Sequence, residues 1–185
     1  MVPVLAILRP TALVLFLNLL TADAAAPPRV GEKAPDFTLK TIADESVRLE
    51  SLVDKSPVVL VVLRGWPGYQ CPLCTAQVAE LVREARSFRE QKAHVVLVYP
   101  GPADGLKEHA SEFANGKGLP EGFDLVLDPD YAFTNSYGLR WDAPKETAYP
   151  STFVIDSGRE VKFAKVSHEH GGRARADEIL KALSR

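Results

Sequence analysis

The feature that most constrains this chain is a hydrophobic run that leads into a pair of cysteines and then into a helical pattern. Residues 57–63 form a continuous apolar, β-branched run, which predicts a buried strand. Beyond the cysteines, apolar side chains recur at helical spacing over residues 75–91, which predicts a helix with one buried face. Cys71 and Cys74 are therefore expected at a strand-to-helix junction.

This junction favours a reactive thiol. Pro72 falls where the first turn of the helix is expected to begin, a position that tolerates proline. The N–H groups of a first turn lack partners and carry partial positive charge, which stabilises a thiolate beside them. Because the thiolate is the nucleophilic form, we expect Cys71 to attack and to be the more exposed sulfur. Cys74, inside the first turn, is expected to be shielded and to resolve.

Three other interpretations of the cysteines compete with redox chemistry. A structural disulfide would close a very small loop and constrain the unfolded chain little. A zinc site needs about four ligands, and His168 and His170 are separated by a single residue, which is not the usual spacing of a histidine pair. Two inert buried thiols are the third possibility, because free cysteine packs as a small hydrophobe. A redox pair is the interpretation we favour.

The N-terminal residues predict export. The chain begins with a predominantly apolar stretch, in which Arg9 precedes the longest apolar run, and an Ala-x-Ala pattern follows. We therefore expect residues 1–24 to be a signal peptide and the mature protein to be periplasmic or extracellular, without stable membrane insertion. An uncleaved N-terminal membrane anchor is the alternative. Outside the cytosol, a dithiol is free to cycle through a redox-active disulfide.

The remaining sequence is of single-domain size and is expected to form one domain over residues 29–185. A formal net charge of −2 argues against a nucleic-acid partner. The basic residues Arg173 and Arg175 are interpreted as the solvated start of a helix.

Predicted strands and helices alternate along the chain, and a hairpin follows late. This order predicts an α/β fold with a mixed central sheet and helices on both faces. The expected strands are 36–39, 47–49, 57–63, 94–99, 125–127, 151–155 and 161–166, and the expected helices are 75–91, 103–115, 131–137 and 176–183.

Two motifs together resemble a known superfamily. A Cys-Pro-x-Cys at a strand–helix junction, with the run from Tyr149 to Asp156 ahead of a hairpin, resembles the thioredoxin-like superfamily. Residues 30–39 resemble the start of its redoxin branch, the alkyl hydroperoxide reductase/thiol-specific antioxidant (AhpC/TSA) group, which includes peroxiredoxins. The resemblance extends over about residues 29–184. It implies a thioredoxin-like fold and no cofactor beyond the Cys71–Cys74 pair.

The resemblance also implies a role for a proline. In thioredoxin-like proteins the proline before the penultimate strand is cis and lies against the cysteine pair, and Pro150 fits that position. The implied role of Pro150, with Tyr149 beside it, is to shape the groove that receives a partner's disulfide. An ordinary trans proline at the start of a strand is the alternative.

Two reactions then compete. In a thiol–disulfide oxidoreductase, Cys71 attacks a partner's disulfide and Cys74 resolves the mixed disulfide, so the partners are protein thiols or disulfides or a small thiol reductant. In an antioxidant peroxidase, a thiolate attacks a hydroperoxide and becomes a sulfenic acid, which the second cysteine condenses to a disulfide.

The peroxiredoxin pattern Pro-x-x-x-Thr/Ser-x-x-Cys matches this chain poorly. Aligned on Cys71, the pattern places Arg64 at its proline and Gly68 at its hydroxyl residue. Aligned on Cys74, Pro67 fits, but Cys71 replaces the hydroxyl residue, and Pro150 occupies the place of the downstream arginine. We therefore prefer disulfide exchange. Arg64 is interpreted as a solvated or ion-paired residue, or alternatively as a substitute positive charge.

A third hypothesis is a non-catalytic redoxin-fold module that binds a partner through a groove around Trp66, Tyr69 and Pro150. Exposed aromatic side chains would support it, because they anchor interfaces. Trp66 and Tyr69 are equally compatible with a place in the core. The intact Cys-Pro-Leu-Cys sequence argues against a purely structural module.

Overall fold

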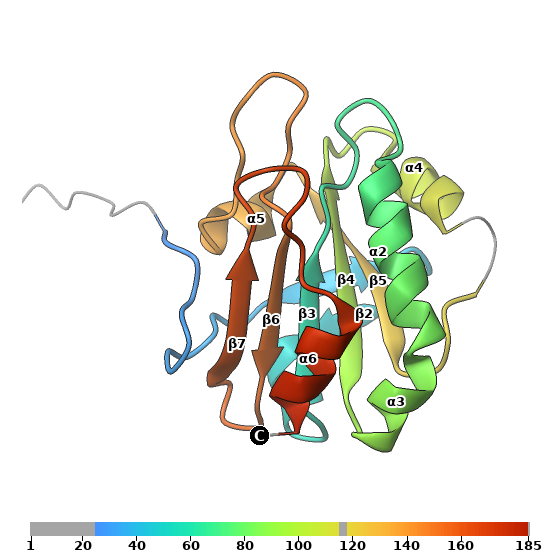
Figure 1. The fold of residues 1–185 in the computed structure, drawn as a ribbon. Coiled ribbons are helices and arrows are strands. Elements are labelled where there is room, and N and C mark those ends of the chain that lie inside the picture. The colour runs from blue at the N-terminus through green and yellow to red at the C-terminus, as the bar shows by residue number, and fades with distance from the viewer. Residues whose placement is uncertain (1–24, 115–117, 185) are drawn as a thin grey trace, which may run out of the picture.

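A seven-stranded mixed sheet organises the protein (Figure 1), and its strands follow the order β2-β1-β5-β4-β3-β6-β7. The computed structural model describes residues 25–114 and 118–184. The central strands β3, β4 and β5 are parallel, and the outer strands pair antiparallel. The strands are β1 (Thr38–Thr41), β2 (Ser46–Arg48), β3 (Val58–Val62), β4 (His94–Gly101), β5 (Phe123–Pro129), β6 (Ser151–Ile155) and β7 (Val161–Val166).

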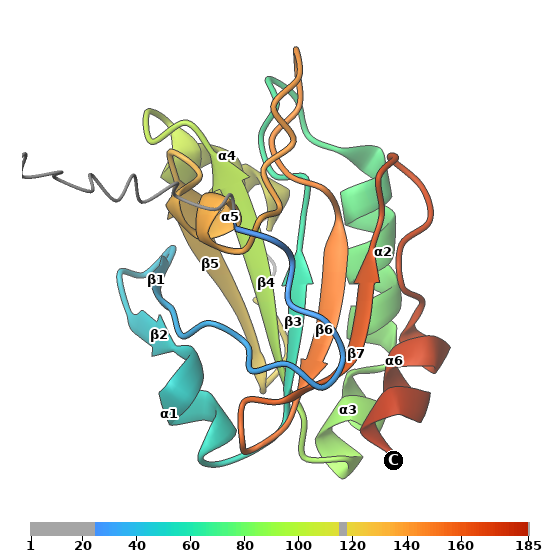
Figure 2. The same ribbon diagram turned by 90° about the vertical axis from the view of Figure 1, so that its left-hand side faces the viewer.

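Helices cover both faces of this sheet, as the two views in Figures 1 and 2 show. One face carries α2, α3, α4 and α6, and the other carries α1 and α5. The helices are α1 (Leu49–Val53), α2 (Pro72–Arg83), α3 (Ala85–Glu90), α4 (Leu106–Phe113), α5 (Ala132–Ser136) and α6 (Ala176–Leu183). The predicted α/β fold with a mixed sheet is confirmed.

The buried strand β3 contributes to both cores because successive side chains of a strand point to opposite faces. Val59 and Val61 pack under α2 and its neighbours, whereas Leu60 and Val62 pack toward α1 and α5. All five residues of β3 are buried, which explains why its sequence is a continuous apolar run rather than an alternating one.

Two predicted helices differ from the structure. The single helix expected over 75–91 is divided, because the backbone at Glu84 (φ −93°, ψ 11°) leaves the helical conformation between α2 and α3. Phe88 still reaches the core after the break, so the apolar periodicity continued across it. The helix expected over 103–115 begins only at Leu106, because Gly105 adopts a left-handed conformation (φ 70°) immediately before it.

The short helix α1 was not predicted. It follows directly on β2, and the prediction had placed Leu49 at the end of a strand. The predicted signal peptide at 1–24 lies outside the described residues. Across residues 25–114 and 118–184, the helices are all too short or too polar to span a bilayer.

Candidate active site

The segment after β3 runs close beside the end of β4 before it reaches the cysteines. The amide of Leu63 donates to the Val98 carbonyl (2.9 Å), and the amide of Trp66 donates to the Pro100 carbonyl (2.9 Å). Between them, Gly65 has φ +62°, and a Cβ atom there would lie 1.9 Å from the Pro100 oxygen. Glycine is therefore required at this close approach, which sets the path of the chain toward α2.

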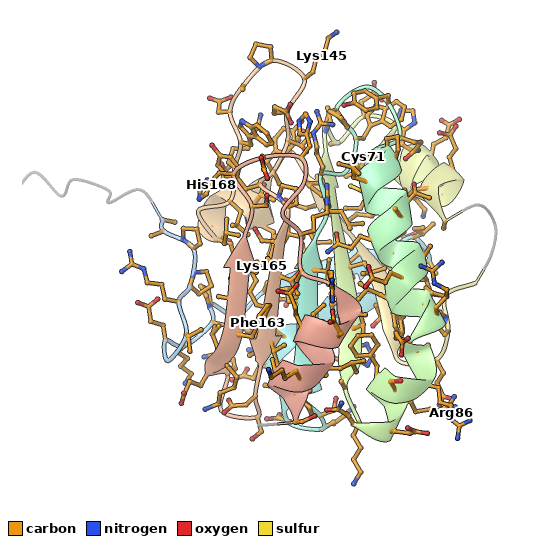
Figure 3. The ribbon with its side chains drawn as sticks, in the orientation of Figure 1. Cys71, Arg86, Lys145, Phe163, Lys165 and His168 are labelled. Atoms are coloured by element: carbon orange, nitrogen blue, oxygen red, sulfur yellow. The ribbon has the colours of Figure 1, made fainter. Side chains whose placement is uncertain are left out.

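Cys71 is the N-cap of α2 and Cys74 lies in the first turn, with Pro72 as the first helical residue. This arrangement agrees with the predicted strand-to-helix junction, and Figure 3 shows Cys71 at the upper end of α2. Both residues are free thiols. Cys74 is shielded as expected, at 1% exposed, but Cys71 is only marginally the more exposed of the two, at 3%, so both thiols are buried. Both sulfurs lie near a guanidinium group from a distant segment, which the sequence interpretation had placed in solvent.

The two thiols differ in acidity. Hydrogen bonding with the Cys74 thiol lowers the pKa of Cys71 to about 5, despite burial, and the Cys74 amide and the charge of Arg173 add to the effect. No regular N-cap hydrogen bond forms from the helix to the Cys71 side chain. The same sulfur–sulfur hydrogen bond, together with burial, raises the pKa of Cys74 well above its ordinary value. The pair therefore consists of a thiolate at Cys71 and a neutral thiol at Cys74 near neutral pH.

Arg173 is the residue that the sequence interpretation missed. It lies between β7 and α6, and its Nη2 is 3.9 Å from the Cys71 sulfur and 3.5 Å from the Cys74 sulfur. Its Nη1 donates to Oε1 of the buried Gln77 (3.0 Å), whose own Nε2 donates to the carbonyl of Ala174 (3.3 Å). The interpretation of Arg173 as a solvated residue was therefore wrong.

One sequence signal could have pointed to this contact. Gln77 lies three residues after Cys74, on the buried face of the predicted helix, and a buried amide needs a hydrogen-bonding partner. The signal indicates that some polar group approaches the cysteine helix. It does not indicate which one.

Arg64 is buried and ion-paired, as one of the two sequence interpretations proposed. Its Nε donates to Oε2 of Glu146 (2.6 Å), and its Nη2 donates to the Lys145 carbonyl (2.6 Å). Its Nη1 donates to the Tyr69 hydroxyl, and its backbone amide donates to the Cys74 sulfur (3.3 Å). The side chain of Arg64 thus joins the loop before α2 to the loop before β6, and its backbone contacts the redox pair.

The two aromatic residues of the motif occupy different environments. Trp66 is partly buried and stacks on the His109 ring of α4, with ring centroids 3.5 Å apart. Tyr69 is 42% exposed, and Pro67 beside it is half-buried. Trp66 is therefore part of the packing against α4, and Tyr69 is the aromatic side chain available at the surface.

Gln70 strengthens the contact between this loop and α4. Its Oε1 accepts a hydrogen bond from the Tyr99 hydroxyl (2.8 Å), and its Nε2 donates to the His109 carbonyl (2.8 Å). Burial raises the pKa of Tyr99, which keeps its hydroxyl neutral and able to donate. The loop from Arg64 to Cys71 is therefore held by the loop before β6 on one side and by β4 and α4 on the other.

Pro150 is buried at the entrance to β6, where Ser151 pairs with Val62 at the end of β3. Every peptide bond in the described parts of the chain is trans, so the cis bond implied for Pro150 was wrong. The trans proline leads directly into an extended strand, and its carbonyl accepts the Ser167 amide (2.9 Å). A strand tolerates proline at its start because no ladder hydrogen bond needs the missing N–H.

Tyr149 faces the loops above the sheet rather than the core. Its ring stacks on Trp141 at 5.0 Å between centroids and meets the His168 ring edge-on at 4.7 Å. His168 and His170 have separate partners, because the His170 ring contacts Glu146 instead. Within residues 25–114 and 118–184, no cluster of three metal-ligating side chains occurs.

Comparisons with known proteins agree with this geometry. The model of the AhpC/TSA family matches residues 30–164. Peroxiredoxin Bcp of Bacillus subtilis is 29% identical over 162 residues, which cover 84% of this chain and 96% of that protein. Thiol-disulfide oxidoreductase ResA of Halalkalibacterium halodurans is 26% identical over 133 residues, which cover 72% of this chain and 66% of that protein.

Solved structures match the fold as well. The peroxidoxin BcpB of Mycobacterium tuberculosis aligns with a TM-score of 0.69 at 25% identity, over 85% of this chain and 97% of that one. A peroxiredoxin-like protein of Aquifex aeolicus aligns with the same TM-score, 0.69, at 16% identity, and this likeness concerns the fold alone. These similarities include both reaction classes that the sequence had left in competition.

Proposed function

The chain belongs to the AhpC/TSA family of thioredoxin-like oxidoreductases, and on that premise we propose that it is a thiol–disulfide oxidoreductase in which Cys71 attacks and Cys74 resolves. The observation that carries the proposal is the difference between the two thiols. Cys71 is held as a thiolate, and its neighbour Cys74 keeps its proton. The pair therefore contains a nucleophile, Cys71, and a protonated thiol, Cys74, that can resolve the mixed disulfide.

In the first step the Cys71 thiolate attacks one sulfur of a partner's disulfide. A Cys71–partner disulfide forms, the partner's own S–S bond breaks, and the other partner sulfur leaves as a thiolate. Cys71 is 3% exposed, so the partner disulfide must approach it from the adjoining surface. Tyr69 (42% exposed) and Leu73 (45% exposed) offer apolar surface on the same loop and helix start.

The second step follows from what raises the pKa of Cys74. Its largest cause is the hydrogen bond to the Cys71 sulfur, and the negative charge of Cys71 contributes as well. Both causes vanish once Cys71 is tied up in a mixed disulfide. The Arg64 amide and the Arg173 guanidinium remain, and both stabilise a thiolate at Cys74. Formation of the mixed disulfide thus activates its own resolution.

Cys74 then passes its proton to solvent or to the departing sulfur and attacks the Cys71 sulfur. The Cys71–Cys74 disulfide forms, the partner leaves as a thiol, and two electrons have moved from this protein to the partner. A thiol reductant, either a protein or a small molecule, restores the dithiol.

Two cysteine variants test the order of attack. Cys74→Ser is expected to accumulate a covalent mixed disulfide with a disulfide substrate, and Cys71→Ser is expected to accumulate none. Non-reducing electrophoresis followed by mass spectrometry measures the adducts. If Cys71→Ser trapped adducts and Cys74→Ser did not, the roles would be reversed.

A second function, reduction of hydroperoxides, is favoured by the contact of Arg173 with both sulfurs, because a cation there polarises a bound peroxide. In that reaction the thiolate attacks one peroxide oxygen, the O–O bond breaks, and an alcohol or water leaves after protonation. Cys74 then condenses with the Cys71 sulfenic acid and releases water.

The hydroxyl groups near the pair support the first function. Thr75 donates its hydroxyl to the Cys71 carbonyl (3.3 Å) rather than to a sulfur, and Thr147 donates to the Arg64 carbonyl. Stopped-flow measurement of peroxide consumption by the reduced protein separates the two reactions. We expect peroxide to react little faster than with free cysteine, while insulin disulfides are reduced readily. A peroxide rate several decades higher would reverse the preference.

We further propose that the protein acts outside the cytosol, after cleavage of residues 1–24. The apolar segment and the Ala-x-Ala pattern support this proposal. Mass spectrometry of the periplasmic or secreted fraction tests it, and the expected mature chain begins near Ala25. An intact Met1 terminus on a cytosolic species would contradict the proposal.

A further inference from the structure

A closed series of contacts begins at the Cys74 sulfur, passes through four other residues and returns to the same sulfur. Its members come from four separate parts of the chain: the loop after β3, the loop before β6, the loop after β7, and α2 itself. The connecting loops rise above the same end of the sheet in Figure 1. We call this ring the thiol ring, and its members are Cys74, Arg64, Glu146, His170 and Arg173.

Each contact of the thiol ring is a hydrogen bond or an ion pair. The Arg64 amide donates to the Cys74 sulfur (3.3 Å), and the Arg64 side chain donates to Oε2 of Glu146 (2.6 Å). Oε1 of Glu146 lies 2.9 Å from Nε2 of His170. The carbonyl of His170 accepts from Nε of Arg173 (3.1 Å), and Nη2 of Arg173 returns to Cys74 (3.5 Å).

Burial divides the ring into a rigid half and an accessible half. The side chains of Arg64 and Glu146 are 3% and 11% exposed, so neither charge tolerates the loss of its partner. The His170 side chain is 49% exposed and rests against the Trp141 ring, with centroids 5.2 Å apart. His170 is therefore the member that can be replaced with least damage to the fold.

His170 contributes to the ring in two ways at once. Its side chain is anchored to the buried Glu146, and because a carboxylate only accepts, Nε2 must be the protonated nitrogen. Its backbone carbonyl receives the Arg173 guanidinium. The position of the carbonyl follows the position of the anchored side chain, so the anchor sets where Arg173 is held.

We propose that His170 is a positioning residue for the reactive thiolate: its bond to Glu146 holds the loop that aims Arg173 at the two cysteine sulfurs. The inference rests on the proposed function, since it concerns how the Cys71 thiolate of that reaction is stabilised. It assigns no contact of His170 with a substrate. Without the anchor, the His170 carbonyl no longer fixes Nε of Arg173, which keeps its contact with Gln77, and the thiolate loses part of the stabilisation that this cation gives.

Three variants test the proposal through the titration of Cys71, followed by thiolate absorbance and by the pH dependence of alkylation. His170→Ala removes the anchor and is expected to raise the Cys71 midpoint by about one pH unit, the low end of the effect of a neighbouring cation. His170→Gln places an amide N–H near the position of Nε2 and is expected to restore most of the wild-type midpoint. Asp124→Asn is the matched control.

The control breaks a comparable pair in a region remote from the cysteines. His94 and Asp124 lie 2.8 Å apart on β4 and β5, and His94 begins β4 at the end opposite to the redox loop. Asp124→Asn is expected to leave the Cys71 midpoint unchanged. A shift in this variant as large as that of His170→Ala would mean that any such ion pair moves the titration, and the proposal would fail.

A double-mutant cycle separates positioning from direct charge. In an Arg173→Gln background, His170→Ala is expected to add nothing to the Cys71 midpoint, because the cation that it positions is absent. The same shift in both backgrounds would overturn the proposal. So would an unchanged midpoint in His170→Ala, or a shift in the uncharged His170→Gln as large as in His170→Ala.

The same data distinguish failure of this inference from failure of the proposed function. A wild-type protein without an acidic Cys71 or without disulfide reductase activity would contradict the proposed function. A wild-type protein with an acidic Cys71 that His170→Ala leaves unaltered would contradict the positioning role alone.

Discussion

The two faces of the central sheet differ in the kinds of side chain that they bury. Under α1 and α5, aromatic rings pack against one another: Phe133 and Tyr137 stack at 4.3 Å, and Phe37 meets Phe133 edge-on at 5.2 Å. The Tyr137 hydroxyl is satisfied by the Pro35 carbonyl (2.6 Å). This face packs mainly aromatic and aliphatic side chains, and its buried Asp128 carboxylate accepts hydrogen bonds from the Phe133 and Thr134 amides, so the face contributes stability.

The face under α2, α3, α4 and α6 instead admits polar and reactive groups. It holds both cysteines and the buried amide of Gln77, and a cavity of about 220 Å³ lies beside α2 among Val78, Phe113 and other apolar side chains. The Thr152 hydroxyl is buried without a hydrogen-bond partner among the described residues. A reactive site thus costs this face some of the packing and hydrogen bonding that the opposite face retains.

The contrast is sharpest within β6, where Thr152 and Phe153 are consecutive. Both are almost fully buried, but Phe153 joins the aromatic cluster with Tyr137, at 6.3 Å between centroids. Thr152 alternates to the opposite side of the sheet. Adjacent residues of β6 therefore pack into two different cores, the aromatic one and the one that contains the cysteines.

The largest expected effect is on activity. Cys71→Ser removes the nucleophile and is expected to lower disulfide reductase activity by about 10³-fold or more. At about pH 5, where the thiolate adds little stability, the free energy of unfolding is expected to change by only about 1 kcal/mol, since the substituted group is small. Insulin reduction and urea unfolding measure the two quantities. Activity that survives the substitution would show that Cys71 is not the attacking thiol.

The next effect is on stability and belongs to the other face. Phe153→Ala is expected to lower the free energy of unfolding by about 3–5 kcal/mol, because it opens a cavity in the aromatic cluster. The Cys71 midpoint is expected to stay where it is. Phe163→Ala, at a half-buried position on β7, is the control and is expected to cost less. A shifted Cys71 midpoint in folded Phe153→Ala would contradict the separation of the two faces.

A smaller effect concerns acidity on the cysteine face. Arg173→Gln is expected to raise the pKa of Cys71 from about 5 by about one unit, because it removes a cation near the thiolate. Arg175→Gln is the matched control, since Arg175 is paired with Asp177 on the surface. The pH dependence of iodoacetamide alkylation measures both. Equal shifts in the two variants would mean that net charge, rather than contact, sets the acidity.

The same shift predicts a pH dependence of stability. The pKa of Cys71 is lower in the folded protein than its ordinary value of 9.0, so the folded state releases this proton first. The stabilisation is present above pH 9 and is lost as the pH falls toward about 5. Unfolding by urea across this range is expected to show a weaker dependence in Arg173→Gln than in the wild type.

The smallest effect tests the unpartnered hydroxyl. Thr152→Val removes a buried group that has no hydrogen bond, so the free energy of unfolding is expected to stay level or to rise by about 1 kcal/mol. Thr134→Val on the other face is the matched control. Its buried hydroxyl donates to the Tyr131 carbonyl (3.2 Å), and its loss is expected to cost about 1 kcal/mol. A similar loss in both variants would mean that Thr152 has a partner in solution.

Much of the fold was predictable because its signals are local. The apolar run of β3 and the helical periodicity after the cysteines each reflect a repeat within a few residues. Pro72 at the first helical position and the alternation of strands with helices added to the prediction. Helix boundaries were less accurate, because turns at Gly105 and Glu84 depend on backbone angles that periodicity does not encode.

The surroundings of the cysteines were only partly predictable. The position of Cys71 at the start of α2 followed from the sequence, but its burial did not, because the groups around it include one from beyond β7. The resemblance to thioredoxin-like proteins predicted the fold correctly and the cis geometry of Pro150 wrongly.

The sequence by itself determined that two cysteines meet a helix N-terminus beside a buried parallel strand. Tertiary structure alone decided which charged side chains lie around that pair. Arg173 lies 102 positions from Cys71, and Glu146 lies 82 positions from Arg64, so no local pattern joins them. They meet because β6 and β7 return beside β3 and bring their loops to the same end of the sheet. The repeat of a helix or a strand relates residues only a few positions apart, whereas an ion pair forms wherever the fold brings opposite charges together.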